Sequence, residues 1–338
     1  MTPVMVNGAF RAQRVTGQQR YATEIADRLV AGPGVAEARP EGRWAGSAGR
    51  EWAWTLTRLP RLARHSTLVS LTSRAPLGVK QVLAVHDLFV LTHPEWYSRR
   101  YVATHAPALR AQIRAATTVI AVSEPAAQQV RDRFGVDVVV APNAPSRVFR
   151  ERGRTGDAVL GRLGISPGRY LLTVGSLDPR KNLARLAAAY ERLPAPERAV
   201  MPLVVVGAGA AIYRSSDFDP PGGMTSAGYV SDDELASLYR ESRAVVFPSL
   251  AEGFGLPLVE AAAAGARALV ISDIPVFRWI CGDGAEYVDP TSVESISRGL
   301  RAAVDGEVPA IGIDGSRFDW DASAAVVAQA CELSGAAR

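Results

Sequence analysis

Two glutamates flank a glycine-rich turn in the segment AEGFGLPLVEA, where Glu252 and Glu260 stand eight positions apart. The segment follows an apolar run and precedes an alanine-rich stretch that favours a helix. A glycine turn leading into a helix presents backbone N–H groups that suit a phosphate. Glu260 could then accept the two hydroxyls of a ribose, and Glu252 those of a sugar beside the phosphates. Alternatively, Glu260 only complements the helix dipole and Glu252 is a solvated loop residue.

A pair of cations stands in the segment LLTVGSLDPRKNL, where Arg180 and Lys181 are expected to open a helix after a buried strand. Cations at a helix N-terminus oppose the dipole, so a purely structural role is disfavoured. Lys181 also stands out because Lys80 is the only other lysine in the chain. An anion held by the pair and by the helix N–H groups would reverse the sign of the interaction. The segment therefore predicts an anion site.

Two further candidates lie in the first half of the chain. His86 and Asp87 follow the apolar run QVLAV, at the expected carboxyl end of a strand. That placement favours a functional His86 as much as a structural histidine hydrogen-bonded by Asp87. Gly17 lies at a loop-to-helix junction with Thr16 as a candidate cap, although an ordinary entry turn also explains it.

Three other patterns resemble known binding or structural motifs only in part. The run VVVGAGAAIY begins like a dinucleotide fingerprint, but Ile212 replaces its third glycine and no acidic residue closes the next strand, which argues against NAD. Asp217 and Asp219 could hold a divalent cation, yet their Gly/Pro-rich loop favours a solvated role. Cys281 and Cys331 are isolated, which argues against a disulfide scaffold or a CxxC metal site.

The elements that must position these residues alternate along the whole chain. Short β-branched runs such as QVLAVHD, YLLTVGS and AVVFPS alternate with amphipathic helical patterns, which predicts an α/β protein with parallel sheets covered on both faces. We expect two doubly wound domains, residues 1–150 and 151–319, with a hinge in the polar stretch that begins at Arg147. Ligands of such sheets bind at the carboxyl ends of the strands.

The composition limits the classes of function. Of the 338 residues 48% are hydrophobic and 21% charged, which supports two ordinary cores, and neither a long apolar run nor a signal peptide is visible, so a cytoplasmic protein is expected. The net charge of +4 suits nucleotides, phosphates or an acidic membrane surface and is too small for nucleic-acid binding. Arg58, Arg61 and Arg64 offer a peripheral contact with the inner face of the membrane, or a merely solvated face.

Taken together, the order and spacing of these segments resemble the retaining glycosyltransferases of family 4, which include bacterial mannosyltransferases of surface polysaccharides. The resemblance covers essentially the whole chain and is strongest in VGSLDPRKNL, in AGYVSDDELASLYRESRAVVFPSLAEGFGLPLVEAAAAG and in ISDIP. It implies the GT-B fold: two Rossmann-like domains facing across a cleft, an acceptor-side domain 1–150 and a nucleotide-sugar domain 151–319. The last helix, 320–338, is expected to cross back onto the first domain.

The resemblance also implies roles for individual residues. Glu252 and Glu260 match the family's E-x7-E pair, the first for the donor sugar and the second for the ribose. Lys181, with Arg180, would neutralise the departing diphosphate. The remaining implied contacts are backbone N–H groups of Phe254, Gly255 and Leu256 for the phosphates and sugar, Val230 for the base, His86 for the transferred sugar and Gly17 for the sugar-phosphate. The chain departs from the family where many members have Arg, at Ser176, and Arg180 is the candidate replacement.

The expected activity is the transfer of a hexose from GDP-mannose or a UDP-sugar, and mannose is the hexose expected first. The acceptor is expected to be a hydroxyl of a glycan, of a lipid-linked molecule or of a small molecule. No metal or further cofactor is expected. Acceptor contacts are expected from the first domain, around Trp96, Tyr97 and Arg99. The alternatives are another GT-B reaction such as epimerisation of an NDP-sugar, or a catalytically silent protein that only binds the nucleotide sugar.

Overall fold

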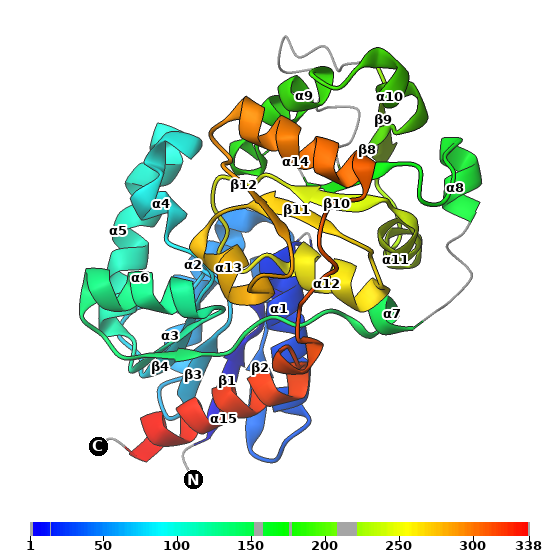
Figure 1. Ribbon diagram of the computed structural model, residues 1–338. Coiled ribbons are helices and arrows are strands. Elements are labelled where there is room, and N and C mark those ends of the chain that lie inside the picture. The colour runs from blue at the N-terminus through cyan, green and yellow to red at the C-terminus, as the bar shows by residue number, and fades with distance from the viewer. Residues whose placement is uncertain (1–2, 14, 152–157, 176–177, 208–221, 337–338) are drawn as a thin grey trace. The chain divides into compact units, whose positions relative to one another are not determined.

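The chain forms two compact units in the computed structural model, which describes residues 3–13, 15–151, 158–175, 178–207 and 222–336 (Figure 1). Unit 1 comprises Met1–Asn143 together with Phe318–Arg338, and unit 2 comprises Ala144–Arg317. Sequence analysis placed the boundary at residue 150. The structure assigns the segment before 150 to unit 2 because Arg147–Arg150 forms a short helix, α7, that contacts other helices of unit 2.

Unit 1 is built on a sheet of six parallel strands in the order β2-β1-β3-β4-β5-β6. These strands are β1 (Val4–Asn7), β2 (Val35–Ala38), β3 (Thr67–Ser70), β4 (Gln81–Val85), β5 (Thr118–Ala121) and β6 (Val138–Val140). The helices of the unit are η1 (Gly8–Ala12), α1 (Gly17–Val30), η2 (Gly42–Trp44), α2 (Ala48–Thr57), α3 (Leu59–Leu62), α4 (Phe89–Thr92), η3 (Pro94–Trp96), α5 (Arg99–Ala115), α6 (Glu124–Phe134) and α15 (Trp320–Ala336).

Unit 2 repeats the architecture with the strand order β12-β11-β10-β7-β8-β9, again parallel throughout. Its strands are β7 (Leu171–Val174), β8 (Leu203–Val206), β9 (Met224–Gly228), β10 (Ala244–Phe247), β11 (Leu269–Ser272) and β12 (Glu286–Val288). Besides α7, its helices are α8 (Ala158–Leu163), η4 (Pro179–Lys181), α9 (Leu183–Glu191), α10 (Ala195–Val200), α11 (Asp232–Glu241), α12 (Leu256–Ala264), α13 (Pro275–Cys281), α14 (Val293–Asp305) and η6 (Gly315–Arg317). The predicted pair of doubly wound, Rossmann-like domains is confirmed.

Burial follows the position of each strand in its sheet. The central strands β8, β10 and β11 are buried along their whole length, as continuous apolar runs flanked by helices on both faces require. The edge strands β2, β9 and β12 are only partly buried. Edge position explains why sequence analysis missed β2, since the run VAEA carries an acidic residue and lacks a continuous apolar pattern.

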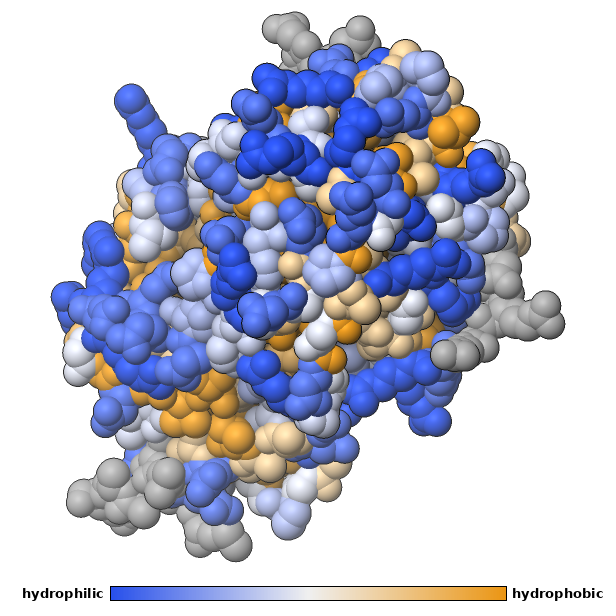
Figure 2. All heavy atoms as spheres, in the orientation of Figure 1, coloured by the Kyte–Doolittle hydropathy of each residue, from blue (hydrophilic) through white to orange (hydrophobic). Residues whose placement is uncertain are grey.

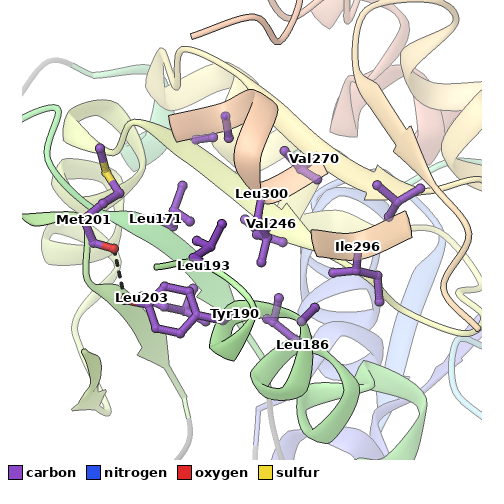
Figure 3. Packing of buried hydrophobic residues seen from close by; sticks show 14 of the residues in the cluster. Leu171, Leu186, Tyr190, Leu193, Met201, Leu203, Val246, Val270, Ile296 and Leu300 are labelled. Atoms are coloured by element: carbon purple, nitrogen blue, oxygen red, sulfur yellow. Dashed lines mark hydrogen bonds between the residues drawn. The ribbon is translucent and has the colours of Figure 1, made fainter. Parts of the chain in front are cut away.

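The core of unit 2 lies between the sheet and the helices α9 and α14, while α11 and α12 pack side by side on the other face (Figure 1). Figure 3 shows side chains from both layers meeting there, among them Leu186 and Tyr190 of α9, Ile296 and Leu300 of α14 and Val246 of β10. The Tyr190 hydroxyl donates to the carbonyl of Met201 at 3.1 Å, so this large buried ring also satisfies its polar atom.

Helix α15 belongs to unit 1, although unit 2 precedes it in the chain. It packs along α1 and contacts β3, β4, β5 and β6. The Ser323 hydroxyl, 2% exposed, donates to the carbonyl of Pro142 at 2.8 Å. Outside the cores, hydrophilic side chains cover most of the face shown in Figure 2.

Candidate active site

The two connections that follow β7 and β10 leave the sheet of unit 2 at one place. From β7 the chain runs outward to β8 and β9 and then returns to β10 on the other side of β7. Ligands of doubly wound sheets bind at such a switch point, outside the carboxyl ends of the strands. The candidate residues Arg180 and Lys181 follow β7, and Glu252 follows β10.

Glu252 joins the two connections by binding both cations. Its Oε1 accepts from Nζ of Lys181 at 2.7 Å, and its Oε2 accepts from Nη1 of Arg180 at 2.6 Å. The side chain of Glu252 is 7% exposed, against 15% for Lys181 and 20% for Arg180. A carboxylate that occupies both of its oxygens with charged donors is held in one orientation. Sequence analysis selected these three residues separately, and the structure brings them together.

Charge is balanced within this cluster. Burial alone raises the pKa of Glu252, but the nearby charges of Lys181 and Arg180 and a hydrogen bond from Ser249 outweigh it and hold that pKa below its ordinary value. Asp178 adds a second carboxylate, since its Oδ2 accepts from Nη2 of Arg180 at 3.1 Å. The four ionised side chains therefore sum to zero, because two cations face two carboxylates.

The cation pair does not open helix α9, which corrects the expectation from sequence. Arg180 and Lys181 end a separate 3-10 turn, η4, and the side chain of Asp178 caps this turn by accepting from the backbone N–H of Arg180. Asn182 then adopts the left-handed conformation and α9 begins at Leu183. The Lys181 stem lies across Gly175, where an added Cβ would stand 3.3 Å from the lysine Cγ. The absence of a side chain at Gly175 thus lets the lysine lie close to the end of β7.

The glycine turn forms the N-terminus of α12, as sequence analysis expected. Gly255 is the N-cap with a φ of 94°, a conformation that favours glycine, and Pro257 stands in the first turn, where its missing N–H costs nothing. A Cβ on Gly255 would lie 2.8 Å from Cε1 of Phe277, so the backbone here packs directly on a ring of α13. Phe254 is buried and meets the ring of Trp279 edge-on at 6.2 Å. The half-buried Leu256 is the first residue of the helix.

The remaining candidates of unit 2 lie on or beside the neighbouring helices α11 and α12. Glu260 is one turn into α12 and only 6% exposed. Val230, 8% exposed, stands between the end of β9 and the capping box that starts α11 at Ser231. Tyr229, directly before it, is 83% exposed. Because α11 and α12 both begin at the carboxyl ends of strands and pack against each other, these residues share one edge of the unit.

His86 lies in unit 1, directly after β4, where sequence analysis placed it. Its Nε2 lies 2.9 Å from the carbonyl oxygen of Leu71. A carbonyl only accepts, so Nε2 carries the proton, and in the neutral ring Nδ1 is an acceptor. Burial lowers the pKa of His86 to about 4, against a smaller opposing effect of that hydrogen bond. The imidazole is therefore neutral at pH 7. Asp87 accepts from the backbone N–H of Phe89 at 3.1 Å.

Gly17 is the first residue of α1 and is exposed. A Cβ at this position would meet nothing within 4 Å, so packing does not require glycine here. Thr16 occupies the N-cap position, but its hydroxyl bonds the side chain of Gln19 instead of capping a backbone N–H. One turn further, the buried ring of Tyr21 meets the imidazole of His86 edge-on at 5.1 Å. Tyr21 thus packs the helix that Gly17 begins against His86.

Some sequence expectations fall outside the described residues, namely those on Ser176, Ile212, Asp217 and Asp219. Within the described part of the chain, no group of three or more His, Cys, Asp or Glu side chains is arranged to hold a metal ion. A hollow of about 1380 Å³ lies at the opposite, amino-terminal edge of the unit 1 sheet, lined partly by Val4, Leu29 and Ala328. It is remote from the strand ends that carry the candidate residues of that unit.

Four residues of the site were missed by sequence analysis. Asp178 caps η4, Ser249 bonds Glu252, Tyr21 packs on His86, and Asn182 joins three loops. Only Asp178 had a signal in the sequence, because Asp before Pro is typical of a turn or cap. The other contacts depend on which loops meet in space.

Each unit contains a segment that matches a glycosyltransferase family model. The family model described as "Glycosyltransferase Family 4" matches residues 15–144, and the model "Glycosyl transferases group 1" matches residues 162–312. The chain is 27% identical over 270 residues to O-antigen chain mannosyltransferase B of Escherichia coli, covering 73% of this chain and 66% of that one. It is also 27% identical over 250 residues to the Escherichia coli serotype-specific mannosyltransferase WbdA, covering 68% of this chain and 29% of that one. The match thus spans less than two thirds of either relative.

Solved structures share the fold. Sucrose-phosphate synthase from Thermosynechococcus elongatus superposes with a TM-score of 0.76 at 16% identity, covering 100% of both chains. Anabaena HepE, solved in complex with UDP-glucose, superposes with a TM-score of 0.72 at 14% identity, covering 98% of this chain and 99% of that one. At these identities the likeness concerns the fold alone.

Proposed function

Because this chain belongs to the GT-B glycosyltransferases of family 4, we propose that it transfers a hexose, with retention of configuration, from a nucleoside diphosphate sugar to a hydroxyl acceptor. The observation that carries the proposal is the cluster of Arg180, Lys181 and Glu252 at the switch point of unit 2, beside the N-terminus of α12. Two cations next to a helix N-terminus suit a diphosphate, and a carboxylate between them suits sugar hydroxyls.

In the proposed reaction the bond between the sugar C1 and the phosphate oxygen breaks, and both electrons remain on the departing diphosphate. The acceptor hydroxyl forms the new bond to C1 and gives its proton to the diphosphate. Positive charge develops on the sugar ring while negative charge builds on the phosphate. Arg180 and Lys181 would stabilise that negative charge more in the transition state than in the ground state, which is the requirement for catalysis.

The remaining residues take the following proposed roles. Backbone N–H groups of Phe254, Gly255 and Leu256 bind the phosphates and the sugar, and Glu260 binds the ribose. The main chain at Val230 meets the base. In unit 1, Gly17 approaches the sugar-phosphate. The neutral His86 accepts a hydrogen bond from a sugar hydroxyl at Nδ1, because its Nε2 already donates to the carbonyl of Leu71.

We propose mannose as the sugar because the two relatives are named mannosyltransferases, one of an O-antigen chain. The acceptor would then be a growing glycan or its lipid-linked form. GDP-mannose is the first donor to test and UDP-glucose the second, since a structural neighbour was solved with UDP-glucose.

The first experiment is a thermal-shift panel with GDP, UDP, dTDP, ADP and NAD, each with and without EDTA. A ligand at a hundred times its Kd stabilises by about 2.7 kcal/mol, which shifts Tm by roughly 2–4 °C in units of this size. We expect one nucleoside diphosphate to act in the presence of EDTA and Glu260→Ala to abolish the shift. Stabilisation by NAD alone, or loss of every shift in EDTA, would contradict the donor class and the metal-independent mechanism.

Turnover separates the alternatives. A transferase releases free nucleoside diphosphate only when an acceptor hydroxyl or water receives the sugar, whereas an epimerase returns an isomer of the donor. A silent binding protein binds the donor and releases nothing. His86→Asn gives an independent check, because it should lower kcat while leaving the Kd of the nucleoside diphosphate unchanged.

Contact with a membrane surface is a separate proposal for unit 1. Leu56 and Leu62 are 52% and 46% exposed, and the exposed Arg58, Arg61 and Arg64 lie among them in and after helices α2 and α3. Each cation near an anionic bilayer contributes about 1 kcal/mol to the free energy of membrane binding. The exposed leucines add apolar area that the bilayer can bury. No helix in the described part of the chain is long and apolar enough to cross a membrane.

Co-sedimentation tests this surface with vesicles of phosphatidylglycerol and phosphatidylcholine. Replacing Arg58, Arg61 and Arg64 by Gln should abolish binding to the anionic vesicles. The matched control replaces the exposed Arg110, Arg114 and Arg133, which changes the net charge equally on another surface. Equal loss in both triple variants would mean that only the overall charge matters.

A further inference from the structure

Asn182 has a backbone conformation unlike that of its neighbours. Its φ of 61° and ψ of 30° are left-handed, and among the described residues it is the one non-glycine with a positive φ. Asparagine adopts the left-handed conformation more readily than most residues do. Even so, a non-glycine residue keeps this conformation mainly where contacts with the surrounding structure hold it. The conformation ends the turn η4 directly after Lys181 and allows α9 to start in a new direction.

The side chain of Asn182 is buried, 7% exposed, and fully used. Nδ2 donates to the carbonyl of Pro248 at 2.8 Å and to the carbonyl of Pro290 at 2.7 Å. Oδ1 accepts from Nη1 of Arg185. One amide therefore joins three segments: the junction of η4 with α9, the connection that leaves β10 and the connection that leaves β12.

Two of these segments carry the proposed diphosphate site. Lys181 precedes Asn182, and Pro248 precedes Glu252 by four positions. A second link ties the same segments, since the backbone N–H of Leu250 donates to the carbonyl of Arg180 at 2.8 Å. Neither link uses the charged groups of the cluster, and the two links fix its halves relative to each other before any anion binds.

We infer that Asn182 is a positioning residue, which holds Lys181 and Arg180 at hydrogen-bonding distance from Glu252 and so prepares the cation pair for a diphosphate. The inference rests on the proposed function for the identity of the ligand, but the geometry of the cluster can be tested without a ligand. The alternative is a buried amide that stabilises unit 2 and has no effect on the cations.

The main variant is Asn182→Gly, which keeps the positive φ accessible and removes only the amide. Asn182→Ala removes the amide and also strains the backbone, so it should unfold at a lower temperature than the glycine variant. The matched control is Gln112→Ala. Gln112 is a buried amide of unit 1, 2% exposed, whose Nε2 donates to the carbonyl of Ala75 at 2.7 Å. It should lower Tm without changing nucleotide affinity.

Two measurements are made on the full chain, well below the lowest Tm of the variants. Calorimetric titration with GDP and with UDP should show about tenfold weaker binding in Asn182→Gly, a loss of about 1.4 kcal/mol. In a background that carries both Arg180→Ala and Lys181→Ala, the same substitution should weaken binding less than about twofold, because a residue that acts through these two cations has nothing left to position. The second measurement follows the carboxyl carbon of Glu252 by NMR, and its titration midpoint should move upward in Asn182→Gly.

Each outcome decides the inference. Unchanged affinity and an unchanged Glu252 midpoint in Asn182→Gly overturn it, whatever happens to Tm. An equal loss of affinity with and without the two cations also overturns it. If the wild type binds neither GDP nor UDP, the proposed donor fails, and the Glu252 midpoint alone then supports or overturns the positioning role.

Discussion

Lys181 and Glu252 are separated by 71 positions in the chain, yet Nζ of the lysine lies 2.7 Å from Oε1 of the glutamate. Arg180 takes the other oxygen of the same carboxylate. The cations that we propose hold the leaving diphosphate are thus already bound to the residue that we propose binds the sugar. A diphosphate that binds these cations would share them with Glu252 or replace it, and a replaced Glu252 would be available to the sugar hydroxyls.

This arrangement predicts opposite effects of Glu252→Gln on binding and on catalysis. The neutral amide competes less for the two cations, so the Kd of the nucleoside diphosphate that stabilises the wild type should fall at least about threefold. Activity with the intact donor should fall by about two orders of magnitude, because sugar hydroxyls lose a charged acceptor. Calorimetry and initial rates measure the two effects.

Glu197→Gln serves as the control for that prediction. Glu197 also pairs with an arginine of unit 2, Arg301, at 2.8 Å, but on a helix remote from the switch point. Nucleotide affinity should stay at the wild-type value in this variant. If Glu252→Gln binds nucleoside diphosphate more weakly than the control, the competition described above is wrong.

The two glycines that bound α12 should differ in their tolerance of alanine. Gly265 has a φ of 83° and no atom within 4 Å of an added Cβ, so Gly265→Ala should cost only about 1 kcal/mol of backbone strain. Gly255 has a φ of 94° and a Cβ there would overlap Phe277, so Gly255→Ala should cost about 1–3 kcal/mol more. Chemical denaturation measures both, and equal losses would show that Phe277 moves aside without cost.

Burial of His86 predicts a dependence of stability on pH. In the folded state its pKa is lowered to about 4 from an ordinary value of 6.5, so the unfolded chain takes up the proton first on acidification. The contribution of neutral His86 to the free energy of unfolding is fully present above about pH 6.5. It is lost as the pH falls toward 4, which lowers that free energy by at most about 3 kcal/mol. His86→Gln should show a correspondingly flatter loss of stability between pH 7 and 4. Parallel curves for the two proteins would contradict a neutral, buried imidazole.

Tyr229 should contribute to binding of the base. It is 83% exposed and directly precedes Val230, and an exposed aromatic ring can stack on a nucleobase. Tyr229→Ala should weaken binding of the active nucleoside diphosphate about tenfold, which corresponds to about 1.4 kcal/mol, and leave binding of inorganic pyrophosphate unchanged. Tyr229→Phe, which keeps the ring, should retain most of the affinity. If Tyr229→Ala leaves the affinity for the nucleoside diphosphate unchanged, the base does not stack on this ring.

Much of unit 2 could be predicted because its signals are local. The buried strands are continuous apolar runs, and the start of α12 is marked by glycine and proline in positions where each is favoured. Glu252, Lys181 and Gly255 could be selected for the same reason, since each stands directly after a recognisable strand or before a recognisable helix.

The errors arose where tertiary contacts decide the outcome. The helix expected from Lys181 onward starts two residues later, because Asn182 turns left-handed to reach two proline carbonyls that lie 66 and 108 positions away. Strand β2 forms because β1 offers an edge with which to pair, and its own residues carry little strand signal. The pairing of Glu252 with both cations likewise depends on two strands being neighbours, which no short segment can reveal.

The return of α15 to unit 1 has a consequence for the order in which the protein is made. Unit 2 is one continuous stretch, Ala144–Arg317, inserted between the two pieces of unit 1. On the ribosome all of unit 2 emerges before α15, whose buried Val327 and Cys331 complete unit 1. Unit 2 can therefore fold while unit 1 still exposes the surfaces of α1 and its sheet that α15 will cover. For that interval the apolar surface of unit 1 that Val327 and Cys331 will contact stays exposed on the nascent chain.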